Sequence, residues 1–187
     1  PLSTPMCADE NVDYDSLESL CHFLIEKGIN GLYPNGTTGE VIYLTADERK
    51  KILEHVVKAA AGRAVVFSMV GAATTAETIE LAQHAEKAGA DGIGVVTPYY
   101  HKLSDDQLFA HYKKVSESDF PIYLYAIPQL AANDISVSLA ERIANECPNV
   151  IGIKYSYPDM PRMLKFLNVR GGDFSVVTGP DDLFYCL

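Results

Sequence analysis

One lysine stands at the end of a short apolar run that reads Val-Ile-Gly-Ile-Lys over residues 150–154. A β-branched run of this length predicts a buried strand. Its final residue, Lys154, would carry an amine that is partly removed from water, and such burial lowers the pKa of a lysine. A neutral amine is the species that adds to a ketone carbonyl. We therefore expect Lys154 to form a Schiff base with a substrate; the alternative is a lysine that extends into solvent.

Polar residues follow another apolar run in the sequence Gly-Thr-Thr-Gly-Glu at residues 36–40. Glycine lets the backbone approach a ligand closely, so Gly36 and the hydroxyl and N–H groups of Thr37 and Thr38 could bind a carboxylate without a second charge. A plain turn between a strand and a helix is the alternative. Gly179, which follows a later run, is a further candidate pocket residue.

Tyrosines follow two more apolar runs, in Thr-Pro-Tyr-Tyr at residues 97–100 and Tyr-Ala-Ile-Pro at residues 125–128. A phenol acts as a general acid or base when its hydroxyl belongs to a hydrogen-bonded chain with other hydroxyls. Tyr125 is therefore a candidate for proton transfer, with core packing as the alternative. Tyr100 is a second candidate, for which a subunit interface is the alternative.

These residues need elements that bring them together, and apolar runs alternate with amphipathic stretches along the whole chain. The pattern predicts strands over residues 29–34, 64–70, 91–97, 121–125, 150–154 and 174–178. It predicts helices over residues 17–25, 45–60, 75–88, 104–117, 138–145 and 160–167. Two of these helices open with a capping box, formed by Thr45 with Glu48 and by Ser104 with Gln107.

A regular series of apolar strands and helices indicates an α/β protein with a parallel sheet, either doubly wound or closed into a (β/α)8 TIM barrel. We favour the barrel because polar signals follow nearly every strand and no Gly-x-Gly-x-x-Gly sequence follows the first one. In a barrel the strand ends converge, which would bring Lys154, Tyr125 and Thr37 to one rim.

We count six clear strands and a remnant of an earlier one in residues 1–5. A complete barrel typically needs about 250 residues. We therefore expect residues 1–187 to be a single, partial (β/α)8-barrel catalytic domain that lacks the start of the first strand and everything after the seventh strand–helix unit.

Composition argues against several other classes of function. The net charge of −10 and the pI near 4.8 argue against a nucleic-acid surface. No apolar run approaches the roughly 18 residues of a membrane span. No clustered His, Asp or Glu motif offers metal geometry, so we expect no metal and no cofactor. The spacing of Cys7, Cys21, Cys147 and Cys186 argues against disulfides, predicts small core residues and suits a cytoplasmic protein.

Together and in order, these motifs resemble the dihydrodipicolinate synthase / N-acetylneuraminate lyase family of class I aldolases. The resemblance covers nearly the whole chain, from the Thr-Pro near the N-terminus through GTTGE, TPYY, Y-x-I-P and GIK to the turn at Gly179. It implies a barrel lyase in which Lys154 forms an imine with pyruvate or a related 2-oxo acid. A carbon–carbon bond would then form or break with an aldehyde partner.

The same resemblance implies roles for the other residues. Tyr125 would relay protons and help to position the substrate carbonyl, and Thr37 and Thr38 would bind the substrate carboxylate. Tyr100 would complete a Thr–Tyr–Tyr proton chain from a neighbouring subunit of a homodimer or homotetramer.

The chain departs from the synthase pattern at the residues for the second substrate. Ala126 replaces the usual Asn, and Gln129 and Leu130 stand in place of an Arg that binds the carboxylate of the aldehyde partner. Neuraminate lyases share the Pro-x-Leu pattern but commonly carry Ser-Thr in place of Thr37 and Thr38. The second substrate is therefore left unassigned, and a sugar-derived 2-oxo acid is one candidate. The alternatives are 4-hydroxy-tetrahydrodipicolinate synthase proper and a non-catalytic 2-oxo-acid-binding relative.

Overall fold

The computed structural model describes residues 1–186, except for the side chains of residues 184 and 186. It divides into two compact units, the first formed by Pro1–Val70 and Glu80–Ile93 and the second by Gly71–Ile79 and Gly94–Leu187. Whether they form one catalytic domain stays a prediction.

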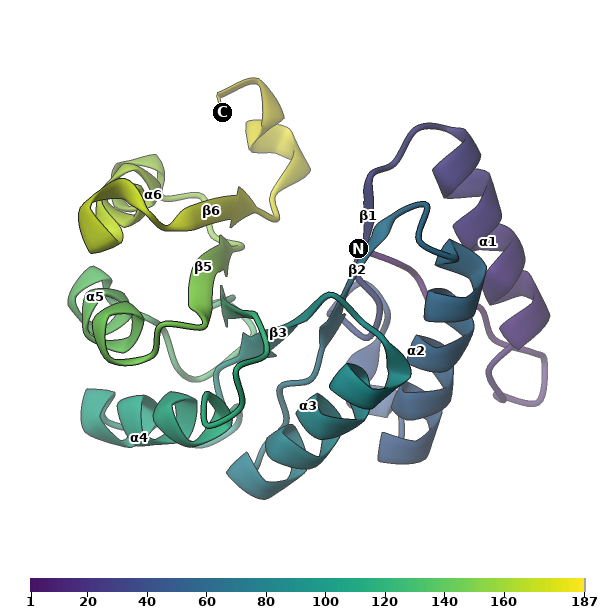
Figure 1. Cartoon of the computed structure of the whole chain (residues 1–187), viewed down its shortest axis with the longest axis horizontal. Coiled ribbons are helices and arrows are strands. Elements are labelled where there is room, and N and C mark those ends of the chain that lie inside the picture. The colour runs from purple at the N-terminus through teal and green to yellow at the C-terminus, as the bar shows by residue number, and fades with distance from the viewer. Residues whose placement is uncertain (187) are drawn as a thin grey trace. The chain divides into compact units, whose positions relative to one another are not determined.

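Strands and helices alternate along the chain (Figure 1). The strands are β1 (Gly31–Leu32), β2 (Val65–Met69), β3 (Gly92–Val96), β4 (Ile122–Ala126), β5 (Val150–Tyr155) and β6 (Ser175–Thr178). The α-helices are α1 (Tyr14–Glu26), α2 (Ala46–Ala60), α3 (Thr75–Ala88), α4 (Asp105–Val115), α5 (Val137–Glu146) and α6 (Met160–Phe166). Short 3-10 helices are η1 (Val41–Tyr43), η2 (Val169–Gly172) and η3 (Asp181–Cys186).

Every predicted strand and helix is present, with ends that differ by a few residues. The strand expected over residues 29–34 is much shorter, because only Gly31–Leu32 pair with β2. Residues 1–5 form no strand. Instead, the N–H of Leu2 donates to the carbonyl oxygen of Tyr33 at 3.0 Å, and Met6 forms an isolated antiparallel bridge with Val12.

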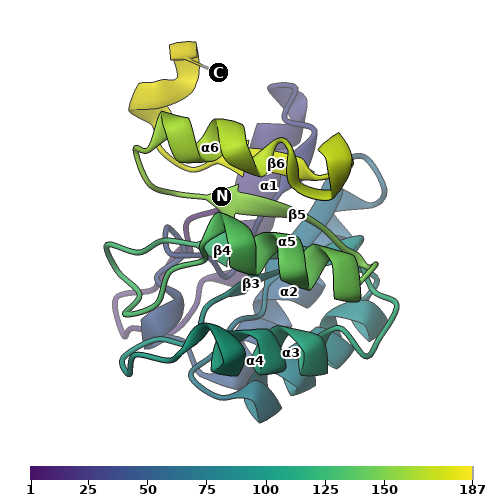
Figure 2. The same ribbon diagram turned by 90° about the vertical axis from the view of Figure 1, so that its left-hand side faces the viewer.

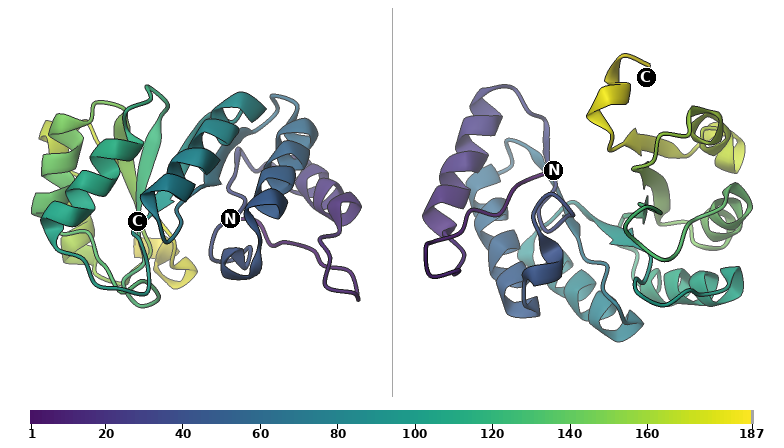
Figure 3. Two further views of the ribbon diagram at one scale, coloured as in Figure 1. Left: turned by 90° about the horizontal axis from the view of Figure 1, so that it is seen from below. Right: turned by 180° about the vertical axis from the view of Figure 1, so that it is seen from behind.

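In the first unit, α1 and α2 lie side by side (Figure 3), and β1 pairs with β2 in parallel. The predicted capping box starts α2: the N–H of Thr45 donates to Glu48 Oε2 at 2.8 Å, and the N–H of Glu48 donates to Thr45 Oγ1 at 3.3 Å. These bonds satisfy donors that a helix N-terminus otherwise leaves unpaired. The core between the two helices includes Leu17, Ile52 and Val56, which are at most 1% exposed.

In the second unit, α4, α5 and α6 lie side by side on one face of the parallel strands β4, β5 and β6 (Figures 1 and 2). The covered face is apolar: Ile153 and Tyr155 are fully buried, and the Tyr155 ring packs against Phe166 of α6 with 5.2 Å between centroids. Successive side chains of a strand point to opposite faces. Lys154 therefore lies on the face of β5 that the helices do not cover.

Apolar runs in a parallel sheet are typical of strands that are buried on both faces, and this holds for β3 but not for β6. All five residues of β3 are buried. By contrast, β6 stands at the edge of the sheet, and its Val177 is 42% exposed.

The cysteines divide between core and surface. Cys21 and Cys147 are buried, as predicted, whereas Cys7 is exposed, and all three are free thiols. The prediction fails at Cys7 because this residue lies in the turn between Met6 and Val12, ahead of α1. The side chain of Cys186 lies outside the described residues. Among residues 1–186, no helix has both the length and the apolar character that crossing a membrane requires.

The absence of a side chain at Gly152 allows β5 to approach its neighbours closely. A Cβ added there would lie 2.4 Å from the carbonyl oxygen of Ser175 and 2.6 Å from Cε1 of Tyr123. Neither the main-chain oxygen nor the packed ring can move far enough to make room for a methyl group. Glycine is therefore required two residues before Lys154, on the same face of the strand.

We expect Gly152→Ala to lower the free energy of unfolding by about 1–3 kcal/mol, because it overpacks a close strand contact. Urea unfolding followed by circular dichroism measures this change. Gly31→Ala is the matched control, since a Cβ at that strand glycine would lie 3.6 Å from the oxygen of Val65, an ordinary contact. Equal losses for the two variants would contradict the explanation.

Candidate active site

Lys154 and Tyr125 face each other across adjacent strands. The two residues are register partners in the parallel pairing of β4 with β5. Lys154 Nζ lies 3.7 Å from the centroid of the Tyr125 ring, within the range of a cation–π attraction. Tyr125 is 2% exposed and Lys154 is half-buried. The structure thus brings these two predicted residues together, and the aromatic ring restricts where the amine can go.

Ser156 is a site residue that the sequence reasoning missed. Lys154 Nζ donates to Ser156 Oγ at 3.1 Å. The backbone of Ser156 is fixed by its N–H, which donates to Ala126 O at 2.9 Å, and by Gln129 Nε2, which donates to Ser156 O at 2.7 Å. A signal was available, because a residue two positions after a strand-end lysine falls on the same face.

Gly179 lies directly against this serine. Its N–H donates to the carbonyl oxygen of Tyr155 at 3.4 Å, and a Cβ added to it would lie 2.0 Å from Ser156 Oγ. Only a hydrogen fits between the turn after β6 and the hydroxyl that accepts from Lys154. Gly179 therefore borders the Lys154 site, and a role in substrate binding stays a prediction.

Tyr155, although it adjoins Lys154 in sequence, belongs to the opposite face and to the core. Burial raises the pKa of Tyr155 to about 12, and the nearby Arg162 guanidinium opposes this rise. Its hydroxyl makes no hydrogen bond within the described structure. The phenol therefore stays neutral and packs on Phe166, which makes it a structural residue.

The predicted carboxylate-binding segment is a tight turn in the first unit. The N–H of Gly39 donates to Gly36 O at 3.0 Å, which leaves Thr37 and Thr38 exposed at the tip of the turn. Gly39 is buried against the N-terminal segment, where Thr4 Oγ1 donates to Gly39 O at 2.7 Å. The turn is therefore anchored at its glycines, and its threonines face outward.

Asn35, just before this turn, is a second residue that the sequence reasoning missed. It is 3% exposed and has a φ of 60°, and its Nδ2 donates to Arg49 O at 2.9 Å and to Ser68 Oγ at 3.3 Å. Asparagine tolerates the left-handed region better than most residues. Asn35 thus turns the chain sharply from β1 into the Gly-Thr-Thr-Gly segment.

Tyr100 lies at the surface, unlike the buried Tyr125. It is 86% exposed, its φ is 79°, and its ring meets that of His101 edge-on at 4.9 Å. A positive φ is unusual for a bulky residue and marks local strain. The segment therefore holds Tyr100 in an exposed, strained conformation on the surface of the second unit.

The chemistry available to the second unit is that of an amine beside a phenol and a hydroxyl. Residues 1–186 contain no group of three or more His, Cys, Asp or Glu side chains that could hold a metal ion. The described geometry fits addition of the Lys154 amine to a carbonyl group, with hydroxyl groups nearby to accept and return protons.

Comparisons with known proteins show the family of this chain. A family model described as the dihydrodipicolinate synthetase family matches residues 1–186. The chain belongs to this family. The 4-hydroxy-tetrahydrodipicolinate synthase of Aquifex aeolicus is 40% identical over 183 residues, which cover 97% of the chain and 62% of that relative.

Solved structures of the dihydrodipicolinate synthetase family share the fold. Dihydrodipicolinate synthase from Acinetobacter baumannii, complexed with pyruvate, is 36% identical with a TM-score of 0.95 over 100% of the chain and 64% of that structure. The 2-keto 3-deoxygluconate aldolase from Picrophilus torridus is 30% identical with a TM-score of 0.94 over 100% of the chain and 67% of that structure.

These matches confirm the predicted α/β class and the incomplete (β/α)8 barrel. The chain spans 62% of the length of the Aquifex aeolicus relative. The resemblance inferred from the ordered motifs is confirmed as well.

We expect Gly179→Ala to lower the free energy of unfolding by about 1–3 kcal/mol, because its methyl group would overlap Ser156 Oγ. Ser156→Gly in the same chain should recover most of that loss, since it removes the overlapping atoms. Urea unfolding of the two single variants and the double variant measures the coupling. Strictly additive losses would show that the two residues do not meet as described.

Proposed function

We propose that the intact protein is a class I aldolase or lyase that forms a Schiff base between Lys154 and pyruvate or a related 2-oxo acid. The observation that carries this proposal is the position of Lys154 Nζ, 3.7 Å from the centre of the Tyr125 ring and 3.1 Å from Ser156 Oγ. Membership of the dihydrodipicolinate synthetase family supports it. So does the pyruvate named with the Acinetobacter baumannii structure.

The reaction would begin when neutral Lys154 adds to the ketone carbon. The carbonyl oxygen takes up a proton, and loss of water leaves a protonated imine. This imine accepts the electron pair released when a carbon–carbon bond breaks, or when a proton leaves the neighbouring carbon before bond formation. Tyr125, Thr37 and Tyr100 would carry the protons, and release of the product by water would return the free amine.

The threonine turn would supply the site for the substrate carboxylate. Gly36, Thr37 and Thr38 offer hydroxyl and N–H donors, and neutral donors bind an anion without a second buried charge. The outward position of the two threonines on their turn supports this role. Gly179 would leave room beside Lys154 for the substrate.

The choice of second substrate would depend on residues that depart from the synthase pattern. Leu130 is 67% exposed and offers no charge, and the Gln129 amide is engaged with Ser156 O. Neither can form an ion pair with a carboxylate of an aldehyde. We propose an aldehyde without a carboxylate at that position, released from or joined into a sugar-derived 2-oxo acid, in line with the aldolase named for the Picrophilus torridus structure. The lysine-pathway synthase, named for the Aquifex aeolicus relative, is the alternative.

The exposed Tyr100 also bears on assembly. A bulky side chain that is 86% exposed and held in a strained conformation is suited to contact a neighbouring subunit. We propose that the intact protein is a homodimer or homotetramer in which Tyr100 completes the proton chain of the adjacent subunit.

Incubating the intact protein with pyruvate and sodium borohydride tests the Schiff base. We expect a covalent adduct on Lys154, with a mass gain equal to pyruvic acid less one oxygen atom. Peptide mass spectrometry locates it. Lys154→Ala should abolish the adduct, whereas Lys165→Ala on α6 should not.

Tyr125→Phe tests the proton-transfer role of the phenol while keeping the Lys154 amine. We expect this variant to lower kcat by a factor of about 10²–10⁴, the usual contribution of a positioned acid or base. No adduct in the folded wild-type protein would refute the aldolase proposal and favour a non-catalytic 2-oxo-acid-binding relative.

The identity of the second substrate is testable with a panel of sugar-derived 2-oxo acids and aldehydes, assayed by pyruvate release or consumption. We expect higher kcat/KM for sugar-derived substrates than for aspartate semialdehyde. Leu130→Arg should narrow that difference by restoring a cation for the carboxylate. A wild-type preference for aspartate semialdehyde would identify the lysine-pathway synthase instead.

A further inference from the structure

One buried side chain holds the segment that carries Tyr100. Asn133 lies between β4 and α5 and is 2% exposed. Its Nδ2 donates to Pro98 O at 2.6 Å and to His101 O at 2.9 Å. Its Oδ1 accepts the N–H of Leu103 at 2.7 Å. The three bonds reach main-chain groups on both sides of Tyr100.

The amide of Asn133 suits this task because it combines two N–H donors with a carbonyl acceptor. Both donors and the acceptor are used. The main-chain oxygen of Asn133 also accepts from Thr97 Oγ1 at 3.3 Å, directly after β3. The segment from Thr97 to Leu103 is therefore tied to a single residue of a different loop.

Tyr100 needs such a restraint. Its φ of 79° is sparsely populated for a residue with a Cβ, and such conformations persist only where the surroundings enforce them. The ring is 86% exposed, so packing of the side chain within the second unit does not supply the restraint. The hydrogen bonds to Pro98, His101 and Leu103 do so through the backbone.

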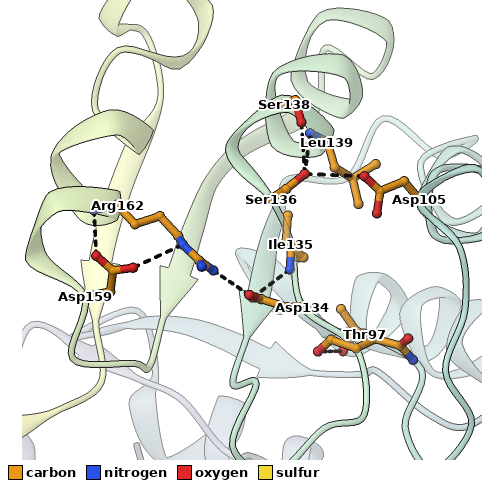
Figure 4. A network of polar contacts seen from close by, with 10 residues as sticks. Thr97, Asp105, Asp134, Ile135, Ser136, Ser138, Leu139, Asp159 and Arg162 are labelled. Carbon is orange, nitrogen blue, oxygen red and sulfur yellow. Dashed lines mark hydrogen bonds and ion pairs between the residues drawn. The ribbon is translucent and has the colours of Figure 1, made fainter.

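Asn133 is itself fixed through the next residue. Asp134 Oδ1 accepts the N–H of Ile135 at 2.8 Å, and Asp134 Oδ2 forms an ion pair with Arg162 of α6. Arg162 Nε lies 3.4 Å from Asp159, the N-cap residue of α6 (Figure 4). The loop that carries Asn133 is thus held against α6, the helix that follows the Lys154 strand.

We propose that Asn133 is a positioning residue that sets the orientation of Tyr100 for proton transfer. The proposal rests on the proposed function, in which Tyr100 belongs to the proton chain. Asn133 touches neither substrate nor the reacting atoms; it acts only through the backbone of the Tyr100 segment. Its loss should therefore slow the proton transfers, while the Lys154 amine is still able to form the imine.

The test compares Asn133→Ala with Asn149→Ala in the intact protein. Asn149 provides a matched control because it also joins two carbonyl groups, with Nδ2 donating to Ser118 O at 2.5 Å and to Phe120 O at 3.0 Å. It precedes the start of β5, whereas Lys154 is near the end of that strand. Both variants lose hydrogen bonds from a side-chain amide to two main-chain carbonyl groups. Only in Asn133→Ala do these carbonyl groups flank Tyr100.

For Asn133→Ala we expect a fall in kcat of about tenfold or more, with KM for pyruvate within about twofold and the borohydride adduct on Lys154 formed as in the wild type. For Asn149→Ala we expect a wild-type kcat at temperatures where the protein is folded. A fall in kcat of equal size in both variants, or in neither, would overturn the proposal.

A double variant shows whether Asn133 acts through Tyr100. If it does, Asn133→Ala combined with Tyr100→Phe should be no slower than Tyr100→Phe alone, within about twofold. Effects that multiply would overturn the proposal, because residues that act as one unit are not additive.

Hydrogen exchange at the Leu103 N–H gives a readout that does not depend on catalysis. We expect faster exchange in Asn133→Ala and not in Asn149→Ala, because only the first removes the acceptor for that N–H. Unchanged exchange would overturn the positioning role whatever the kinetics. Absence of a pyruvate adduct in the wild type, with faster exchange in Asn133→Ala, would instead refute the proposed function and the catalytic consequence while leaving the restraint on the segment demonstrated.

Discussion

The close approach of β5 to its two neighbouring strands is the constraint on which the Lys154 site depends. Gly152 lets the backbone of β5 lie against Ser175, and Gly179 lets the turn after β6 lie against Ser156. With side chains excluded at these two points, the lysine has the Tyr125 ring on one side and the Ser156 hydroxyl as its acceptor. Two glycines that do no chemistry thus determine where the amine can be.

Polar contacts in the second unit fix the loops that lie next to this strand. Asn133 ties the Tyr100 segment to the loop after β4, and Arg162 ties that loop to α6. Because Asp134 and Arg162 are about one third exposed, water screens their attraction, and the pair contributes little stability by itself. The buried amide has the larger effect, since removing it would leave main-chain groups without partners.

The sequence predicted the elements well because its local signals agree with each other. Apolar runs and capping boxes indicate the same boundaries, and the capping box at Thr45 has the predicted hydrogen bonds. The sequence was less accurate where pairing decides the outcome: β1 is two residues long because only two of its residues meet a partner in β2. Cys7 was misplaced because an apolar residue type does not report whether it lies in a turn.

By itself, the sequence determined the fold class, the family and the identity of Lys154 and Tyr125 as candidate site residues, since motif order and strand alternation are properties of the chain. Only the tertiary structure decided what surrounds them. The strand period alone could have placed Ser156 on the face of Lys154, but no sequence pattern indicated the contacts of Asn133, because an asparagine gains its role from the atoms that it meets. The atoms that Asn133 meets belong to residues 30 or more positions away, so their distances depend on packing that no local pattern records.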